Sequence, residues 1–482
     1  MRRLIAVCFA MSVAVSLLPL EALGAGLGTI ETKLIGRGLA SGDTINPINP
    51  FFGWSVAISA DGTTAIVGAP GDNNVGAVVV FTRTGNVWAQ QGAKLTATGG
   101  TGTTDFGKSV ALSADGNTAI VGAPSDNSSV GAAWIFTRTG GVWSQQGNKL
   151  VGTDVNGSTQ EQGASVALSA DGNTALVGAP EDGVFHTGAA WVFTRSGVNW
   201  TQQGNKLVGA PLISDSASLV RQGSGVALSA DGNTALIGGP YLNSETGAVW
   251  IFTRSGTTWS QQGPRLVGTG GTAARQGRYV ALSGDGNTAI AGGPLDNSGA
   301  GAIWVFTRSG TTWTQQGSKL VGTGAVGFTE QGAGVSASAD GNVVLVGGRD
   351  DNSSVGAAWV FARSGGVWTQ QGQKLVGSLA LSAPRQGFGV GLSGDGTLAI
   401  SGAPEDGDIG AAWVFAAPPC SLDIDGNNTI DALTDGLLII RAMLGLTGTN
   451  VTDNALGANP TRSTWAQIRP YLNGNCGTNF AQ

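Results

Sequence analysis

One sequence unit recurs seven times between Phe52 and Phe415, at a period of about 55 residues. One copy reads FGKSVALSADGNTAIVGAPSDNSSVGAAWIFTRTGGVWSQQGNKL. An Asp-Gly step marks every copy, at Asp61, Asp115, Asp171, Asp231, Asp285, Asp340 and Asp395. A fixed period of this size indicates a repeat architecture, so the repeat determines the fold class before any other feature is considered.

The unit is predicted to form four short strands. In the copy quoted above they are Val110–Ser113, Thr118–Pro124, Ala132–Arg138 and Val142–Leu150, and an Ala-Asp-Gly-Asn turn joins the first two. No copy contains an apolar helical period of useful length. Seven four-stranded units favour an all-β fold, a seven-bladed β-propeller, whose radial packing leaves only short protected edges. The alternative is an open β-solenoid, whose coils are usually shorter and more uniform.

The two ends of the array distinguish a closed ring from an open rod. Six copies finish their fourth strand with Lys-Leu or Arg-Leu, whereas the seventh stops after the third strand. The missing strand is found before the first copy, where ETKLIG contains Lys33 and Leu34. An open rod would need terminal caps, and none is visible. We therefore expect a ring closed by an N-terminal strand formed by residues near 29–37.

Tryptophan recurs twice in most copies, once in the third strand and once at the start of the fourth. This regularity favours packing between blades over an exposed aromatic stack for binding sugars, because a buried indole contributes about 4–6 kcal/mol of gross stabilisation. Trp54 lies outside the pattern and is the better candidate for an exposed ring. A basic residue also follows the third strand in six copies, where we expect a structural ring of charges at Arg83, Arg138, Arg195, Arg254, Arg308 and Arg363.

The unit resembles the FG-GAP repeats that form the propeller of integrin α-subunits. The resemblance rests on Phe52-Gly53 and Phe106-Gly107 and on the Gly-Ala-Pro steps at 68–70, 122–124, 178–180 and 402–404. It implies a seven-bladed propeller outside the cell, often acting in adhesion or ligand binding. FG-GAP blades often carry a calcium loop between their first two strands, but here a single carboxylate occupies that place. One carboxylate cannot provide the six to eight oxygens that calcium prefers, so we expect no calcium in the blades.

The N-terminus has the pattern of a signal peptide in residues 1–24, with two arginines, an apolar run and a small-residue cleavage site near Gly24. The apolar run is too short to cross a bilayer. We therefore expect a secreted or cell-surface protein with no membrane span, with the propeller in residues 25–417 and a C-terminal module in residues 418–482. The net charge of −6 disfavours nucleic acid as a partner.

Oxygen-bearing side chains alternate at the start of the C-terminal module, at the spacing of an EF-hand-type loop. Thr434 occupies the twelfth position, where a bidentate acid is expected, so either Thr434 or the neighbouring Asp435 completes the site. The alternative is an acidic turn that caps the helix expected at 434–446. The predicted ligands of one Ca²⁺ are Asp423, Asp425, Asn427, Thr429 through its backbone carbonyl, Asp431 and Asp435.

This loop and the following LTDGLLIIRAMLGL resemble the first half of a dockerin, a calcium-dependent module that docks enzymes onto cohesins. The second loop and helix of a dockerin are absent, which argues against cohesin binding and favours a free-standing anchoring or stabilising module. Cys420 and Cys476 bracket the module. Because they are the two cysteines left after signal-peptide removal, we expect them to form a disulfide that joins its ends.

No catalytic set is evident in the sequence. The single histidine, His186, lies in a loop, and no Ser-His-Asp triad can be assembled without it. Pairs of acidic residues such as Glu181-Asp182 and Glu405-Asp406 occur in loops, where we expect them to be solvated. The sequence therefore favours a non-catalytic binding or adhesion protein. The alternatives are an extracellular polysaccharide-active enzyme, a hydrolase or lyase, and a structural cell-surface protein.

Loop lengths predict which face of the propeller binds a ligand. The first-to-second and third-to-fourth turns have constant lengths and share one face of an up-and-down blade. The other two connections vary in length and lie on the opposite face, which we call the variable-loop face. Loop length varies where packing does not constrain the loop, and binding loops are often found at such places. The alternative explanation is neutral variation of exposed loops. We expect a glycan or protein ligand to bind this face near Trp54, Phe185, His186, Tyr241 and the 208–222 loop.

Overall fold

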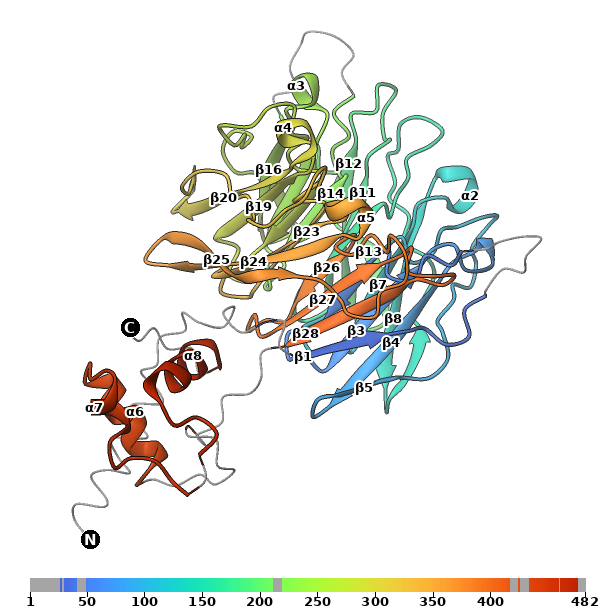
Figure 1. Ribbon diagram of the computed structural model, residues 1–482. Coiled ribbons are helices and arrows are strands. Elements are labelled where there is room, and N and C mark those ends of the chain that lie inside the picture. Colours follow the sequence, from blue (N-terminus) through green and yellow to red (C-terminus); the bar gives the residue numbers. More distant parts are fainter. Residues whose placement is uncertain are drawn as a thin grey trace.

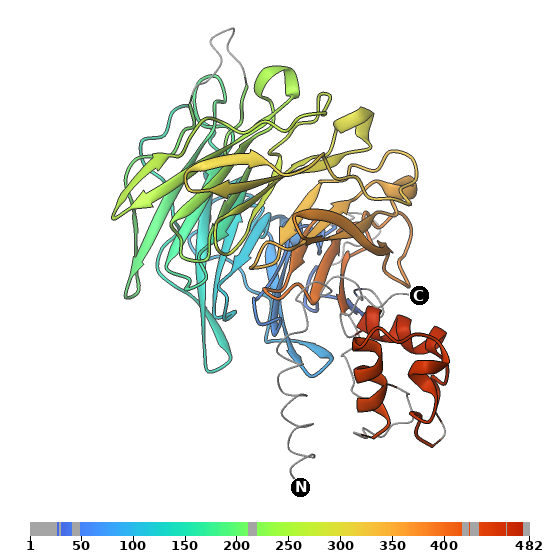
Figure 2. The same ribbon diagram turned by 90° about the vertical axis from the view of Figure 1, so that its left-hand side faces the viewer.

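The computed structural model describes residues 27, 30–40, 49–210, 219–416, 424, 433–458 and 460–475. Within them, seven antiparallel four-stranded sheets surround a central axis, as the views in Figures 1 and 2 show. The prediction of a seven-bladed β-propeller is confirmed. The expected signal peptide, the loop ligands from Asp423 to Asp431 and the cysteines Cys420 and Cys476 lie outside the described residues.

Each blade runs from the axis outward in chain order, with one exception at the seventh. The first three blades contain β2 (Val56–Ile58), β3 (Thr64–Ala69), β4 (Ala77–Thr84) and β5 (Val87–Gln90); β6 (Ser109–Leu112), β7 (Thr118–Ala123), β8 (Ala132–Thr139) and β9 (Val142–Gln145); and β10 (Ser165–Leu168), β11 (Thr174–Ala179), β12 (Ala189–Ser196) and β13 (Asn199–Gln202). The next three contain β14 (Gly225–Leu228), β15 (Thr234–Gly239), β16 (Ala248–Ser255) and β17 (Thr258–Gln261); β18 (Tyr279–Leu282), β19 (Thr288–Gly293), β20 (Ala302–Ser309) and β21 (Thr312–Gln315); and β22 (Gly334–Ala337), β23 (Val343–Gly348), β24 (Ala357–Ser364) and β25 (Val367–Leu375). The seventh contains β26 (Val390–Leu392), β27 (Leu398–Ala403), β28 (Ala411–Ala416) and β1 (Ile30–Leu34).

Short helical turns follow the second strand of five blades, at η2 (Asp72–Asn74), α2 (Asp126–Ser129), α3 (Leu242–Glu245), α4 (Asp296–Gly299) and α5 (Asp351–Ser354). The fourth strands of the first five blades are shorter than predicted, whereas β25 of the sixth has the expected length. In the second blade β9 ends at Gln145, and Leu150 returns to the sheet as an isolated bridge to Ala133. The Gly147 between them has a φ of 70°, so the chain turns away from the sheet edge there.

The Asp-Gly turns are hairpins whose aspartate organises the loop. In the second blade the Ser113 hydroxyl donates to Asp115 Oδ1 at 2.5 Å, and the Asn117 backbone N–H donates to the same oxygen at 3.0 Å. Burial alone would raise the pKa of Asp115, but these hydrogen bonds bring it below its ordinary value. The following Gly116 has a φ of 64°, which a side chain would disfavour.

The residues that precede these aspartates form a closed circle of backbone hydrogen bonds around the axis. In each case the N–H of one blade donates to the carbonyl of the next, at 2.8–3.0 Å, and the last blade donates back to the first. We call this feature the backbone circle. Its members are small in every blade, since neighbouring turns approach closely: Ala60, Ala114, Ala170, Ala230, Gly284, Ala339 and Gly394.

The third-strand tryptophans form the core between blades, as predicted. Trp134 is fully buried in a cluster that joins Ile66 and Val80 of the first blade to Val121 of the second. Its indole N–H donates to the carbonyl of Thr98 at 3.0 Å, so burial leaves no polar group unpaired.

The fourth-strand tryptophans lie mostly at the edge of the core, so the expectation that both sets are core residues holds only for the first. Trp143 is half-buried, and its indole N–H donates to Gln91 of the preceding blade at 2.9 Å. Arg138 stacks on that ring and donates to the same Gln91 and to Thr64. Five of the six arginines link neighbouring blades in this way, and Arg83 lies over Trp88 of its own blade.

A buried aspartate fastens the connection that enters each of six blades. In the second blade Asp126 accepts from the Thr101 backbone N–H at 2.7 Å and pairs with Lys149 at 2.5 Å. Five further blades repeat the ion pair, in Lys94–Asp72, Lys206–Asp182, Lys319–Asp296, Lys374–Asp351 and Lys33–Asp406.

The ring closes through its N-terminal strand. β1 pairs antiparallel with β28, with Lys33 opposite Trp413 and Leu34 opposite Ala412. Lys33 also supplies the cation for Asp406 at 2.6 Å. Lys33 and Leu34 thus occupy the fourth-strand positions that the seventh repeat lacks, which confirms the closure predicted from the sequence.

The described part of the C-terminal segment is helical, with α6 (Asp435–Met443), α7 (Thr449–Thr452) and α8 (Trp465–Asn475). Their apolar side chains pack into a cluster of their own, which includes Leu438, Val451, Trp465 and Ile468. This agrees with the small helical module that the sequence predicts. Across the described residues, no helix combines the length and the hydrophobicity that a membrane crossing requires.

The closure generates a prediction for Lys33. Replacing Lys33 with Met should destabilise the protein by about 3 kcal/mol, because a buried carboxylate at Asp406 would lose its cation. Urea unfolding measures this change, and Lys149→Met in the second blade is the matched comparison. Removing residues 30–34 should be more severe and cause aggregation, because it exposes a sheet edge and Trp413. A deletion variant that unfolds like the parent would contradict the closure.

Candidate functional site

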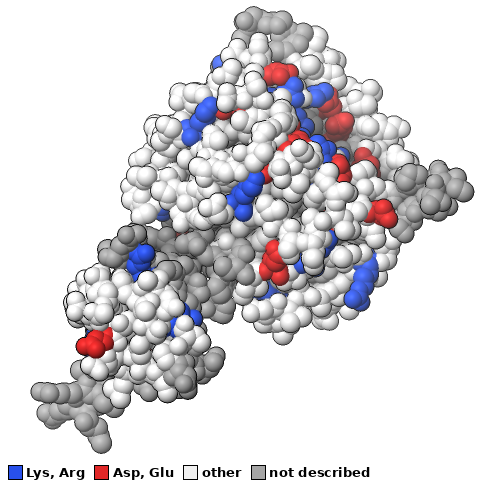
Figure 3. Space-filling model, in the orientation of Figure 1, with Lys and Arg blue, Asp and Glu red and all other residues white. Residues whose placement is uncertain are grey.

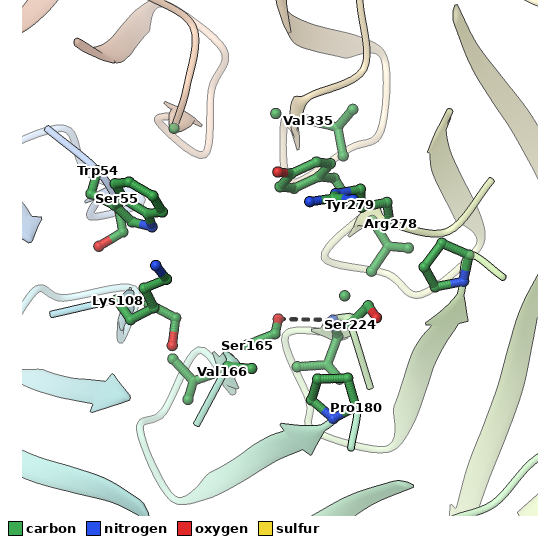
Figure 4. Close-up of a pocket in the computed structure, with 18 of the residues that line it drawn as sticks. Trp54, Ser55, Lys108, Ser165, Val166, Pro180, Ser224, Arg278, Tyr279 and Val335 are labelled. Atoms are coloured by element: carbon green, nitrogen blue, oxygen red, sulfur yellow. Dashed lines mark hydrogen bonds between the residues drawn. The ribbon is translucent and has the colours of Figure 1, made fainter. Parts of the chain in front are cut away.

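A cavity of about 580 Å³ lies on the axis of the propeller, at the variable-loop face. The starts of the first strands line it, together with residues such as Pro180 and Tyr241 from the second-to-third connections. None of the Asp-Gly turns lines it, so the cavity opens away from the backbone circle. Figure 4 shows that its side chains converge on a shared space from several blades.

One position in each repeat supplies the side chains at the mouth of the cavity. It follows the Phe-Gly pair of the first two blades and the Gln-Gly pair of the other five, and we call the set the rim positions. All but Ala333 line the cavity: Trp54, Lys108, Ala164, Ser224, Arg278, Ala333 and Phe388. Two residues further along each strand, a valine from every blade forms a deeper collar at Val56, Val110, Val166, Val226, Val280, Val335 and Val390.

The backbone before each rim position explains why the set is held so regularly. The residue that precedes the Phe-Gly or Gln-Gly pair has a positive φ in all seven blades, including 53° at Asp105 and 56° at Glu161. The glycine of the pair is also required. A Cβ added to Gly107 would lie 2.5 Å from the Ala77 carbonyl oxygen of the neighbouring strand. These constraints turn the chain sharply into the first strand and fix where each rim side chain begins.

Trp54 and Lys108 form a stacked pair at one side of the cavity. Lys108 Nζ lies 3.7 Å from the Trp54 ring centroid, and the Phe388 ring lies 4.3 Å from Trp54 on another side. The prediction that Trp54 is an exposed ring is therefore wrong, since neighbouring blades cover part of it. Burial lowers the pKa of Lys108, although the carboxylates of Asp105 and Glu161 partly oppose this shift.

Arg278, Tyr279 and Arg349 form a second group on the opposite side of the cavity. The Arg349 guanidinium donates to the Tyr279 hydroxyl at 3.4 Å, and Arg349 also pairs with Glu330 at 2.6 Å. Burial alone would raise the pKa of the Tyr279 phenol, but the charges of Arg278 and Arg349 bring it below its ordinary value. The nearby phenol in turn raises the pKa of Arg278.

The third blade supplies an acidic group to the cavity wall. Glu181 pairs with Arg221 at 2.8 Å and with His186 Nδ1 at 2.5 Å. The Tyr241 ring lies beneath Arg221, whose guanidinium carbon is 4.9 Å from the ring centroid. Burial and the neighbouring Glu181 raise the pKa of Glu161, which also lines the cavity.

The structure brings together only some of the residues predicted from the sequence. Trp54 and Tyr241 line the cavity, whereas His186 lies behind the lining residues Glu181 and Arg221, and Phe185 is 57% exposed outside it. Of the 208–222 loop, residues 211–218 lie outside the described part of the chain.

Three of the four carboxylates in these acidic pairs are largely buried, contrary to the expectation from the sequence, and the fourth, Glu405, is 41% exposed. Asp182 and Asp406 are buried against Lys206 and Lys33. Their neighbours Glu181 and Glu405 pair with arginines. Both members of each pair are thus occupied by ion pairs.

Sequence reasoning missed Lys108, Arg278 and Tyr279. The signal that could have found them is the rim position itself, where the side chain changes from blade to blade while the flanking Gly and Val stay constant. Aligning the seven copies of the repeat on that Gly places Lys108 and Arg278 at equivalent positions around one axis.

The cavity is basic although the chain is acidic. Its lining contains four basic side chains, those of Lys108, Arg221, Arg278 and Arg349, and two carboxylates, those of Glu161 and Glu181. The whole chain has a net charge of −6. In Figure 3 charged side chains of both signs gather around a hollow, while most of the remaining visible surface is uncharged. The basic character is therefore local to the cavity.

Comparison with known families agrees with this architecture. A family model described as FG-GAP repeat matches residues 49–81 and 88–136, which cover the first blade and most of the second. These are the two blades that have Phe-Gly where the others have Gln-Gly. No curated protein matches the chain. The chain therefore carries FG-GAP repeats in a seven-bladed propeller.

The surroundings of Tyr279 lead to a prediction about ionisation. The chain has three tyrosines, and Tyr279 should ionise below the ordinary tyrosine pKa because two arginines stabilise its phenolate. Alkaline titration followed by tyrosinate absorbance should show an early phase that Tyr279→Phe removes and Tyr241→Phe retains. A single phase for all three tyrosines would contradict this account.

Proposed function

We propose that this protein is a non-catalytic binding protein of the adhesion type, which recognises an extracellular ligand at the central cavity of its variable-loop face. The observation that carries the proposal is the rim, where six of the seven equivalent backbone positions line one cavity and hold six different side chains. A constant frame that presents varied side chains is typical of a binding surface built on a rigid scaffold. FG-GAP repeats are typical of extracellular proteins, which supports secretion.

The geometry supports a ligand that enters along the axis. The walls combine aromatic rings, such as Trp54 and Tyr241, with charged groups, and this mixture gives both contact area and orientation to a bound molecule. A volume of about 580 Å³ lies within the range of small-molecule sites, so a glycan or an inserted protein side chain could fill it.

An array of glycans and extracellular-matrix proteins tests this proposal. Trp54→Ala and Tyr241→Ala should each weaken binding about tenfold, or by about 1.4 kcal/mol, because aromatic anchors often dominate binding energy. Circular dichroism should show melting temperatures close to that of the parent. Val142→Ala is the control, since Val142 is 70% exposed at the start of β9, beside the third-to-fourth turn on the opposite face. Equal losses in the control would place the ligand elsewhere, and binding to nothing would favour a structural surface protein.

A polysaccharide hydrolase is the second candidate, and one observation favours it. Glu161 and Glu181 both line the cavity, and the pKa of Glu161 is raised while Glu181 is paired with Arg221. Two carboxyl groups in contrasting environments are what a general acid and its partner require. The same array, assayed for released sugar fragments, separates the candidates: turnover that Glu161→Gln abolishes would support the enzyme, and binding without fragments would support the binding protein.

We also propose that the C-terminal module binds one Ca²⁺ and contains the Cys420–Cys476 disulfide. The described residue that bears on this is Asp435, whose buried carboxylate accepts from the Ile424 backbone N–H at 2.6 Å. Asp435 therefore contacts Ile424, which in the sequence lies between two of the other expected ligands, Asp423 and Asp425; the expected ligands Asn427, Thr429 and Asp431 follow. This contact favours Asp435 over Thr434 as the residue that completes the site.

Calcium titration of the full-length protein by calorimetry tests the metal proposal. Asp435→Asn should weaken Ca²⁺ binding at least tenfold, because calcium affinity depends on the number of charged ligands. Asp453→Asn, at an exposed aspartate of the same segment, should bind Ca²⁺ like the parent. A parent protein that binds no Ca²⁺ would refute the site.

A further inference from the structure

We propose that the central cavity binds a short acidic oligosaccharide, with Lys108 and Arg278 each holding one of its carboxylates on opposite sides of the axis. This inference rests on the proposed function, since it assigns a ligand class to the same cavity. It is carried by the arrangement of charges, by the position of the two cations and by the chemistry of the surrounding wall.

Lys108 and Arg278 differ from the other cations of the cavity in having no carboxylate partner. Arg221 pairs with Glu181 at 2.8 Å, and Arg349 pairs with Glu330 at 2.6 Å. Among the described residues, neither Lys108 nor Arg278 forms an ion pair, and both are half-buried at rim positions. The ammonium of Lys108 lies against an aromatic ring, and Arg278 lies beside the Tyr279 phenol, which favours its charged form. An anionic ligand would give each of these two cations the carboxylate that the protein does not provide.

The surroundings of Lys108 also favour the binding of an anionic group at this residue. Its ammonium lies against the Trp54 ring, whose π-face is a weak partner compared with a carboxylate. Burial also lowers the pKa of this lysine. A ligand carboxylate beside the ammonium would be a stronger partner than the ring. It would also raise the pKa of Lys108 again, because a nearby negative charge favours the charged form of the lysine.

The positions of the two cations constrain the size of the ligand. Lys108 belongs to the second blade and Arg278 to the fifth, three blades apart in a ring of seven. Figure 4 shows them on opposite sides of the cavity, with open space between. We therefore infer a ligand that carries two acidic groups, one for each cation.

The rest of the wall favours a sugar over a simple dianion. Trp54 and Phe388 make one side of the wall aromatic, with Lys108 and Arg349 against their rings, so a sugar would meet apolar and basic surface together. Ser55 and Ser109 donate their hydroxyl protons to backbone carbonyls of the neighbouring blades, at 2.8 Å in each case, so their oxygens remain as acceptors for ligand hydroxyls. A cavity of about 580 Å³ has room for a few sugar rings but not for a folded protein domain.

Calorimetry on the full-length protein tests the inference with three probes: trigalacturonate, its neutral methyl ester and monogalacturonate. Trigalacturonate should bind at least tenfold more tightly than either of the others. Lys108→Gln and Arg278→Gln should each weaken its binding at least tenfold, and the double variant at least a hundredfold. Lys108→Arg and Arg278→Lys, which keep the charges, should restore most of the affinity. Rising salt concentration should weaken binding.

Arg37→Gln is the charge-matched control, since the Arg37 side chain is exposed and does not line the cavity. It should bind trigalacturonate like the parent. Melting temperatures of all variants establish that the ring is intact.

The outcomes separate this inference from the proposed function. If an array ligand is lost in Trp54→Ala but retained in Lys108→Gln and Arg278→Gln, the acidic-sugar assignment is overturned and the binding function stands. If trigalacturonate does not bind, or its methyl ester binds equally well, the assignment is also overturned. Tighter binding of hexaglutamate than of trigalacturonate would replace the sugar with an acidic peptide. If neither the array nor the probes bind, both proposals fail.

Discussion

The propeller depends on the burial of apolar surface between each blade and the next. A single four-stranded blade has two faces, and a third-strand tryptophan such as Trp134 can be dry only when the preceding blade covers it. Every blade therefore needs a neighbouring blade on both sides. The first and seventh blades have a second neighbour only because the ring closes and brings them together. This is why the short strand β1 matters far more than its length suggests. It completes the last sheet and supplies the lysine that the seventh repeat lacks.

Polar groups then determine where the connections lie. A buried aspartate such as Asp126 holds both a lysine of its own blade and the backbone of the segment that enters the blade. Such a pair contributes little net stability compared with apolar packing, but removing one member would destabilise the folded state, because the other would remain as a buried unpaired charge. The effect of the aspartate–lysine pair is to fix where the connecting loop enters the blade, whatever the length of that loop. The variable-loop face can consequently change in sequence while the entrances to the blades stay fixed.

The sequence was sufficient for the fold because the fold is periodic. The seven Asp-Gly steps, the recurring tryptophans and the displaced Lys33-Leu34 each report on contacts that repeat within or between adjacent copies. The cavity is different, since its side chains come from blades far apart in the chain. Phe388 covers Trp54 only because the seventh blade lies beside the first. Arg349 of the sixth blade approaches Tyr279 of the fifth, from a position where all six other copies have proline. Partners of this kind leave no local pattern in a single sequence.

The backbone circle has an electrical consequence. Each peptide group in it is a dipole, and in a helix such dipoles add along one direction and bias the two ends. Here they follow one another around the axis and return to the start, so by symmetry their sum is close to zero. The circle also has no first or last member, and hence no orphaned donor or acceptor. The circle therefore contributes little to the electrostatic potential inside the cavity, and the side chains at the rim positions set that potential. Exchanging a charged rim side chain would change the sign of the potential beside it.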